Sequence, residues 1–288
     1  MAKFSARYVS KIMGTKITIL IDNTPDAAGT LQCEKGLSLY IENGPQRILC
    51  DTGLSGAFSD NAAALGIDIS AVDCCFISHA HADHSGGLKR FVDINRDSNI
   101  YIAAEALHTR YFSHRHMSAR DLSIDFDVAN SNTDRFRALH YSTWLSENVA
   151  AVFCNDDSHA RPLGNKYLTK MSGSTELPDD FAHEMSLAIT VGDELVVVSS
   201  CSHCGAANII EACKAFSGKS KLRAFVGGLH FIDSNETSSE VEKLVTYVEK
   251  QARQAKFFVG HCTGDLAKAI LSRHEQFCTF ATGDIISI

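Results

Sequence analysis

A cluster of histidines and one aspartate is the first feature of this sequence that could perform chemistry. His79, His81, Asp83 and His84 directly follow an apolar run at residues 72–78. Side chains two residues apart on an extended chain face the same way, so His79 and His81 can bind one metal ion. Asp83 and His84, on the turn beyond, can bind a second ion. A solvated polar loop is the alternative, but the spacing favours a metal site.

Three further histidines each follow an apolar, strand-like segment later in the chain. They are His203 after residues 195–200, His230 after 225–229 and His261 after 257–260. In α/β proteins, functional groups collect at the carboxyl ends of strands, where loops converge on a crevice. Taken singly, each histidine is as easily a hydrogen-bonded structural residue. Together they predict that imidazoles from four strand ends meet at one site.

The elements that must position these histidines follow an α/β pattern. Strands are expected over 16–21, 37–41, 47–50, 72–78, 185–191, 195–200, 222–226 and 256–259, and helices over 57–65, from about 87, and over 206–216, 238–253 and 265–273. The sequence has four prolines and no tandem repeat, so we interpret residues 1–288 as a single domain. The stretch from about 107 to 182 has poor periodicity and is expected to be an insertion between the two halves.

This expected insertion, residues 107–182, has two interpretations. As a cover over the site, it would contact an anionic substrate through Arg110, Arg115 and Arg120, which lie near His114 and His116. As an interface, it would form a homodimer by burying its aromatic side chains, Phe112, Phe126, Phe136 and Trp144. We favour the cover and keep the homodimer as a further expectation.

The sequence resembles the metallo-β-lactamase superfamily, whose His-x-His-x-Asp-His motif is matched by residues 79–84. Segments 49–53, 180–184, 201–205, 227–230 and 260–264 look like landmarks of one branch, the dihydropterin-methyl ribofuranosyl-aminobenzene phosphate synthase-like group of metal-dependent hydrolases. The resemblance covers roughly residues 37–284 except the insertion. It implies a four-layer αββα sandwich, the metallo-β-lactamase-like fold, with a dinuclear metal site at one edge.

Carried over position by position, the resemblance implies a ligand set for two divalent metal ions, zinc first and manganese or iron as alternatives. The first ion would take His79, His81 and His203, and the second Asp83, His84 and His261. Asp51 would orient a ligand imidazole. Where many members supply a bridging aspartate this chain has Cys201, so either a solvent hydroxide alone would bridge the ions or Cys201 would be a soft metal ligand. His183 is the reserve candidate for the third ligand of the first ion.

The chemistry expected from such a site is hydrolysis by a hydroxide generated on the metal ions. Asp83 and His230 are the catalytic candidates; His230 could bind a substrate oxygen or protonate the leaving group, or be structural. The expected substrate is a small anionic molecule such as a phosphoester, cyclic phosphate, lactone or thioester. The alternatives are a di-iron oxidoreductase that reacts with oxygen or nitric oxide on the same ligands, and a noncatalytic metal-stabilised binding module.

Composition limits the partners and the compartment. The 27 basic and 34 acidic residues give a net charge of −7, so we expect a small-molecule substrate and no general attraction to nucleic acid or an anionic membrane. No apolar run reaches the length of about 18 residues that a membrane span needs, and charges interrupt the amino-terminal segment, so no secretory signal is expected. The ten cysteines are too sparse for a disulfide scaffold, which favours a reducing cytoplasm.

Overall fold

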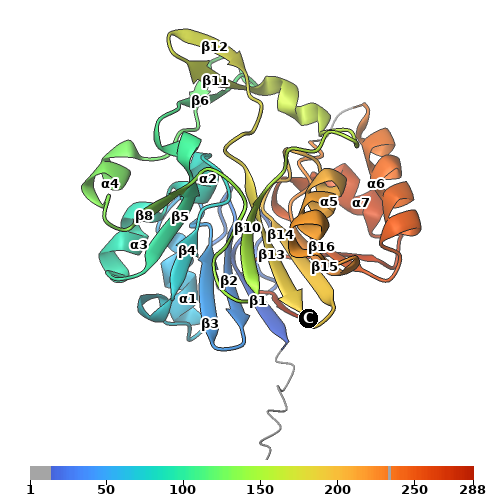
Figure 1. Cartoon of the computed structure of the whole chain (residues 1–288), viewed down its shortest axis with the longest axis horizontal. Helices are drawn as coiled ribbons and strands as arrows, with labels where there is room; N and C mark the ends of the chain where they lie inside the picture. The colour runs from blue at the N-terminus through green and yellow to red at the C-terminus, as the bar shows by residue number, and fades with distance from the viewer. Residues whose placement is uncertain (1–13, 233–234) are drawn as a thin grey trace, which may run out of the picture.

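Two seven-stranded sheets packed face to face form the centre of the computed structural model, which describes residues 14–232 and 235–288. Helices cover the outer face of each sheet, so the order of layers is helix, sheet, sheet, helix (Figure 1). The predicted four-layer αββα sandwich is therefore confirmed. The prediction that no secretory signal is present was made from the amino-terminal segment. Residues 1–13 of that segment lie outside the described residues.

The first sheet holds the motif at residues 79–84. Its strand order is β18 (Ile285–Ser287), β1 (Thr15–Ile21), β2 (Ser38–Asn43), β3 (Gln46–Cys50), β4 (Cys74–Phe76), β5 (Asn99–Ala103) and β8 (Phe136–Leu139). From β3 to β8 the strands run parallel, so their carboxyl ends share one edge. On its outer face lie α1 (Ala57–Ala64), α3 (Leu88–Ile94) and α4 (Phe126–Ser131).

The second sheet carries the later histidines. Its order is β17 (Phe277–Thr279), β16 (Lys256–Val259), β15 (Lys221–Gly227), β14 (Glu194–Ser199), β13 (Met185–Val191), β10 (Val149–Phe153) and β9 (Thr143–Trp144). The strands from β14 to β17 are parallel. The helices α5 (Ala206–Ser217), α6 (Thr237–Gln251) and α7 (Asp265–Leu271) return the chain between them and cover the outer face.

The core between the sheets is built from β-branched and aliphatic side chains of both. Ile41 and Ile48 from the first sheet and Leu187 and Val196 from the second are fully buried in one cluster. Burying such a side chain contributes roughly 1.5–3 kcal/mol relative to exposure. The site is therefore supported by two sheets that share one apolar core.

The predicted insertion is wrong in its middle. Residues 107–182 include β8, β9 and β10, which join the two main sheets. Their short length, and the alanines in β10, hid the strand signal because a short run of small apolar residues has no diagnostic period. Phe136, expected at an interface, is buried with the core.

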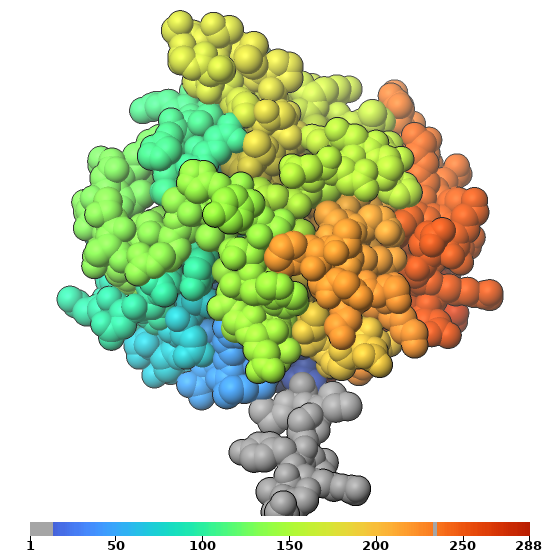
Figure 2. Space-filling view, in the orientation of Figure 1, coloured from blue at the N-terminus to red at the C-terminus, as the bar shows by residue number. Residues whose placement is uncertain are grey.

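Four other strands, all from the expected insertion, form a small separate sheet above the carboxyl ends of the main strands. It consists of β12 (Thr175–Pro178), β11 (Leu168–Ser172), β6 (Tyr111–Ser113) and β7 (Arg120–Asp121). Figure 1 shows β6, β11 and β12 over the upper edge of the main sheets, and in Figure 2 the yellow β11–β12 region projects as a lobe. Within the described ranges, no helix is long and apolar enough to cross a membrane.

Candidate metal centre

Strand ends from both sheets converge beneath this small sheet. The chain leaves β3 into Asp51, β4 toward His79, β14 into Cys201, β15 toward His230 and β16 toward His261. The short helix α2 (Ala82–Ser85) then carries Asp83 and His84. All six histidines predicted at the site are buried: His79, His81, His84, His203, His230 and His261. The ring centroids of neighbouring members lie 4.2 Å to 5.1 Å apart, so the structure brings these imidazoles together.

The first predicted ligand group is closely assembled. His79, His81 and His203 each place one ring nitrogen within 4.8 Å of the others. Their Nε2 atoms are buried and have no hydrogen-bond partner among the residues that the structure describes. A buried polar atom without a partner costs about 1–3 kcal/mol, and imidazole nitrogen is a preferred ligand of zinc. These residues fit a metal ion, which would supply the missing partner of all three atoms.

The opposite ring nitrogens are held by hydrogen bonds that fix the tautomer. Asp51 Oδ2 accepts from His84 Nδ1 at 2.8 Å and from the Ser78 hydroxyl at 2.7 Å, and that hydroxyl accepts from His79 Nδ1 at 2.8 Å. A protonated Nδ1 leaves Nε2 with its lone pair directed at the site. Asp51 therefore orients two imidazoles, one directly and one through Ser78.

Two asparagines perform the same task for the rings of His203 and His261, and sequence reasoning missed both. Asn165 Oδ1 lies 3.2 Å from His203 Nδ1, and Asn23 Oδ1 lies 3.0 Å from His261 Nδ1. Glu184 adds to this support, because its carboxylate accepts the backbone N–H of His203 at 2.7 Å. Neither asparagine lies in a sequence pattern that could have revealed it.

The second predicted group is also assembled. One ligand atom from each of Asp83, His84 and His261 lies within 4.8 Å of the others, and the two Nε2 atoms are 3.1 Å apart. Burial disfavours a charged ring at His84, but Asp83 and Asp51 outweigh it and raise the pKa of His84 to about 9. Burial and the His84 charge lower the pKa of His261 to about 3. The proton on His84 balances the carboxylate, a role that a divalent cation would also fill.

Backbone strain is concentrated at this site. The non-glycine residues with positive φ in the described chain are Asp51, Phe181, Ser202, His230 and His261, with φ between 50° and 61°. Each such conformation costs about 1–3 kcal/mol and persists only where the surroundings enforce it. Four of these residues begin the loops that leave the strands, and Phe181 stacks on His203 with ring centroids 4.6 Å apart. These left-handed backbone conformations turn the chain sharply at the site.

The two residues that the sequence left open have different places. Cys201 Sγ lies 3.2 Å from His84 Nε2 and shares ligand groups with both His79 and His261. His183 has both ring nitrogens occupied: Nδ1 accepts the Ala80 N–H at 3.0 Å and Nε2 donates to Asp179 at 3.0 Å. The Cys201 thiol therefore lies between the two histidine groups. His183 instead fixes the backbone between His79 and His81.

His230 lies at the wall of the site, beside the first group. Its ring packs edge-on against His203, with centroids 4.2 Å apart, and its buried Nδ1 has no hydrogen-bond partner within the described part of the chain. Burial and the nearby Arg115 guanidinium hold the pKa of His230 well below its usual value. A neutral imidazole here can contact a substrate oxygen, and it is a poor proton source.

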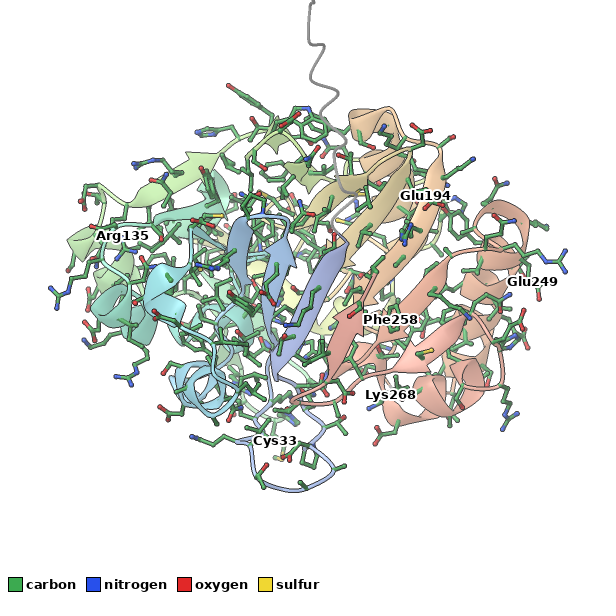
Figure 3. The ribbon with its side chains drawn as sticks, turned by 90° about the horizontal axis from the view of Figure 1, so that it is seen from below. Cys33, Arg135, Glu194, Glu249, Phe258 and Lys268 are labelled. Carbon is green, nitrogen blue, oxygen red and sulfur yellow. The ribbon has the colours of Figure 1, made fainter. Side chains whose placement is uncertain are left out.

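A cavity of about 420 Å³ opens from the metal-ligand groups to the surface. Its walls include Asp83, His230 and His261 and four basic side chains: Lys35, Arg115, Arg120 and Lys268. Figure 3 shows Lys268 and the loop that carries Cys33 at the same margin of the molecule. Arg110, expected beside the other arginines, instead pairs with Asp121 at 3.3 Å outside this cavity. A larger cavity of about 650 Å³, between α5 and α6, contains none of the predicted ligands.

The fold and the two histidine groups define a metallo-β-lactamase-like protein. The model of the metallo-beta-lactamase superfamily matches residues 32–169. A solved structure, Tm1679, described as a metal-dependent hydrolase of the beta-lactamase superfamily, is 25% identical with a TM-score of 0.80 and covers 95% of this chain and 99% of its own. The chain is therefore similar to members of the metallo-beta-lactamase superfamily in sequence and in fold.

Two further comparisons extend the similarity over nearly the whole chain. The 7,8-dihydropterin-6-methyl-4-(beta-D-ribofuranosyl)-aminobenzene-5'-phosphate synthase of Methanocaldococcus jannaschii is 26% identical over 96% of this chain and 98% of its own length. The metallo-beta-lactamase fold protein YhfI from Bacillus subtilis is 14% identical, with a TM-score of 0.57 over 96% of this chain and 100% of its own. The second comparison bears on the fold alone.

Proposed function

We propose that this protein is a dinuclear metal-dependent hydrolase of a small anionic molecule. The observation that carries the proposal is the set of three buried, unpartnered Nε2 atoms of His79, His81 and His203. Beside them lies the second group of Asp83, His84 and His261. The description of Tm1679 as a metal-dependent hydrolase supports the reaction class.

Two divalent ions, when bound, supply an activated water at neutral pH and an electrophile for the leaving oxygen. The residues of this chain then have separate tasks. Asp51 and the two asparagines hold the ligand rings in position, and the strained loops keep that arrangement rigid before substrate arrives. His230, as a neutral imidazole at the wall, contacts a substrate oxygen. Asp83, which also faces the cavity, is available to a proton of the attacking water.

The charges around the cavity favour a substrate with a negative group distant from the reacting bond. Lys35, Arg115, Arg120 and Lys268 line the mouth, against the acidic Asp83 and Asp265. The Nε atom of Arg115 is buried without a partner, so it is free to donate to an anion. The name of the M. jannaschii relative contains a 5'-phosphate, which supports a phosphate as that group. Panel members that carry a phosphate group therefore come first, whichever bond is cleaved.

The test is hydrolysis by protein stripped with a chelator and reloaded with zinc, manganese or iron. The panel contains phosphoesters, cyclic phosphates, lactones and thioesters, and an iron-loaded sample is kept under anaerobic conditions until oxygen or nitric oxide is added. We expect hydrolysis to depend on the added ion. Consumption of oxygen or nitric oxide by the iron form, without hydrolysis of any panel member, would replace the proposal with the di-iron oxidoreductase.

We further propose that this single-domain enzyme acts in the cytoplasm on a small-molecule substrate and does not bind nucleic acid. All ten cysteines are free, which fits a reducing compartment. A homodimer remains a proposal supported by the exposed Trp144 and Tyr141, which lie in the predicted insertion. Sedimentation of the purified chain, with Trp144→Ser as the variant, tests that interface. A monomeric parent would contradict it.

A further inference from the structure

The larger cavity, of about 650 Å³, lies between α5 and α6, two of the helices that cover the second sheet (Figure 1). It shares no lining residue with the cavity at the metal-ligand groups. Its wall includes Gly205 and Phe231, which closely follow His203 and His230 in the chain. Cavities of about 300–1,000 Å³ are typical of small-molecule sites. This second cavity therefore has the size of a ligand site and is separate from the metal centre.

A buried carboxylate is the first polar feature of this cavity. Glu240, on α6, lines the cavity and is only 7% exposed. Its Oε1 accepts the Leu163 N–H at 2.7 Å, whereas its Oε2 is buried and has no hydrogen-bond partner among the described residues. Burial raises the pKa of this carboxyl. A buried carboxylate oxygen is costly unless a donor reaches it, and a positively charged donor compensates best. Oε2 is therefore suited to an ammonium group.

The amino-terminal end of α5 has the opposite preference. Ala206 and Ala207, the first two residues of this helix, line the cavity and are 6% and 9% exposed. Within the described chain, no acceptor meets their backbone N–H groups and no side chain caps the helix. Gly205, with φ of 89°, cannot become a capping residue, because a Cβ atom there would lie 2.9 Å from the Ala160 carbonyl oxygen. Free N–H groups at the positive end of a helix favour a carboxylate.

The wall also includes apolar and aromatic side chains in fixed positions. Phe231, Leu244 and Tyr247 line the cavity and are at most 9% exposed. The Tyr247 hydroxyl donates to Glu211, and the His159 ring packs edge-on against the Tyr247 ring with centroids 5.2 Å apart. Apolar walls with a few well-placed polar groups are typical of sites for small organic molecules. The cavity thus fits an apolar body that carries two charged ends.

We propose that the cavity between α5 and α6 is a second binding site, for a small zwitterion with an apolar body such as an apolar amino acid or dipeptide. Glu240 Oε2 accepts a hydrogen bond from the ammonium group of the ligand. The N–H groups of Ala206 and Ala207 donate to its carboxylate, and its apolar part lies against Phe231 and Tyr247. The site contains none of the predicted metal ligands, so its occupancy does not depend on the proposed hydrolysis.

The direct test is isothermal titration calorimetry of the whole chain with leucine, phenylalanine and the dipeptide phenylalanyl-leucine. We expect saturable binding of at least one of these zwitterions, with one molecule per chain. Its decarboxylated and its deaminated analogue should each bind at least about tenfold more weakly, because each loses a charge-assisted hydrogen bond. Equal binding of either analogue would overturn the zwitterion as the ligand class. Absence of saturable binding by all three zwitterions at millimolar concentration would overturn the site.

Variants assign the two ends of the ligand. Glu240→Gln keeps the shape of the side chain and buries no charge, so the protein should fold and bind at least about tenfold more weakly. The matched control is Glu249→Gln, at an exposed residue of α6 outside the cavity that Figure 3 labels, and it should leave binding unchanged. Ala206→Pro removes one N–H at the first helical position, where proline is tolerated, and should also weaken binding.

The outcomes for these variants are separate. Unchanged binding by Glu240→Gln, or an equal loss in Glu249→Gln, would overturn the assignment of the ammonium group to Glu240. Unchanged binding by Ala206→Pro would overturn the assignment of the carboxylate to the end of α5.

Discussion

Removing the Arg115 side chain should selectively weaken the binding of anionic substrates. Arg115 lies at the cavity wall on a loop of the small upper sheet, with its guanidinium 5.7 Å from the centre of the Tyr167 ring. Its Nε has no hydrogen-bond partner among residues 14–232 and 235–288. The matched control is Arg110, which is already paired with Asp121 and does not line the cavity.

The magnitude follows from the type of contact. A hydrogen bond between charged groups contributes about 1.5–3 kcal/mol, and each 1.4 kcal/mol is a factor of ten. Arg115→Ala should therefore lower kcat/KM for an anionic substrate by about 10- to 150-fold, mainly through KM. Arg110→Ala removes an exposed ion pair of the kind that contributes about 0–1 kcal/mol to stability, and should leave kcat/KM unchanged.

The assay compares two substrates with the same leaving group, one carrying a distant phosphate or carboxylate and one neutral. Metal content and thermal stability are measured for each variant. We expect the Arg115→Ala loss on the anionic substrate only, at unchanged metal content. An equal loss on both substrates, or a similar loss for Arg110→Ala, would refute the reasoning that the upper sheet supplies an anion-binding residue.

Three further predictions follow from the site and its surroundings. His81→Ala should lose about one bound ion per chain and its hydrolytic activity. His274→Ala, which changes a histidine outside both ligand groups, should lose neither. Equal metal content in the two variants would contradict the ligand assignment. His183→Ala should weaken metal affinity because it removes the acceptor of the Ala80 N–H. His183→Gln, which retains an acceptor, should recover part of that affinity in a metal titration. Unchanged affinity in both variants would mean that the His183 side chain only fills space. Burial raises the pKa of the Glu240 carboxyl in the folded protein, so ionisation of this group destabilises the native state once the pH exceeds the pKa that the carboxyl has in the unfolded chain. Glu240→Gln should therefore raise the free energy of unfolding, measured by urea denaturation, at pH 7 and not at pH 4. A gain at both pH values would contradict burial of the charge as the cause.

The sequence was most informative where the functional residues are contiguous. The motif at 79–84 is recognisable from the spacing of its residues alone, and the apolar run before it predicts the strand that leads into it. The position of the site at the end of a strand and most of its ligands could therefore be predicted. His203 and His261 were found because each follows a predicted strand. These strands run parallel, so the residues that follow them lie at the same edge of the sheet.

Partners that meet only through folding were not predictable from one sequence. Asn23 and Asn165 lie in irregular segments, and nothing local distinguishes them from other polar loop residues. Cys262 is adjacent to a predicted ligand, but its meeting with Cys201 depends on how two loops approach across the second sheet. β10 was missed for a different reason, because short apolar strands rich in alanine lack a clear period.

The most direct test of the central claim is a metal titration followed by hydrolysis. Chelator-stripped protein is titrated with zinc, and both the bound metal and the rate on a responsive phosphoester are recorded at each addition. We expect no activity without metal, and a rise that ends at two equivalents per chain. Full activity of the stripped protein, or saturation of both binding and activity at one equivalent, would contradict a dinuclear hydrolase.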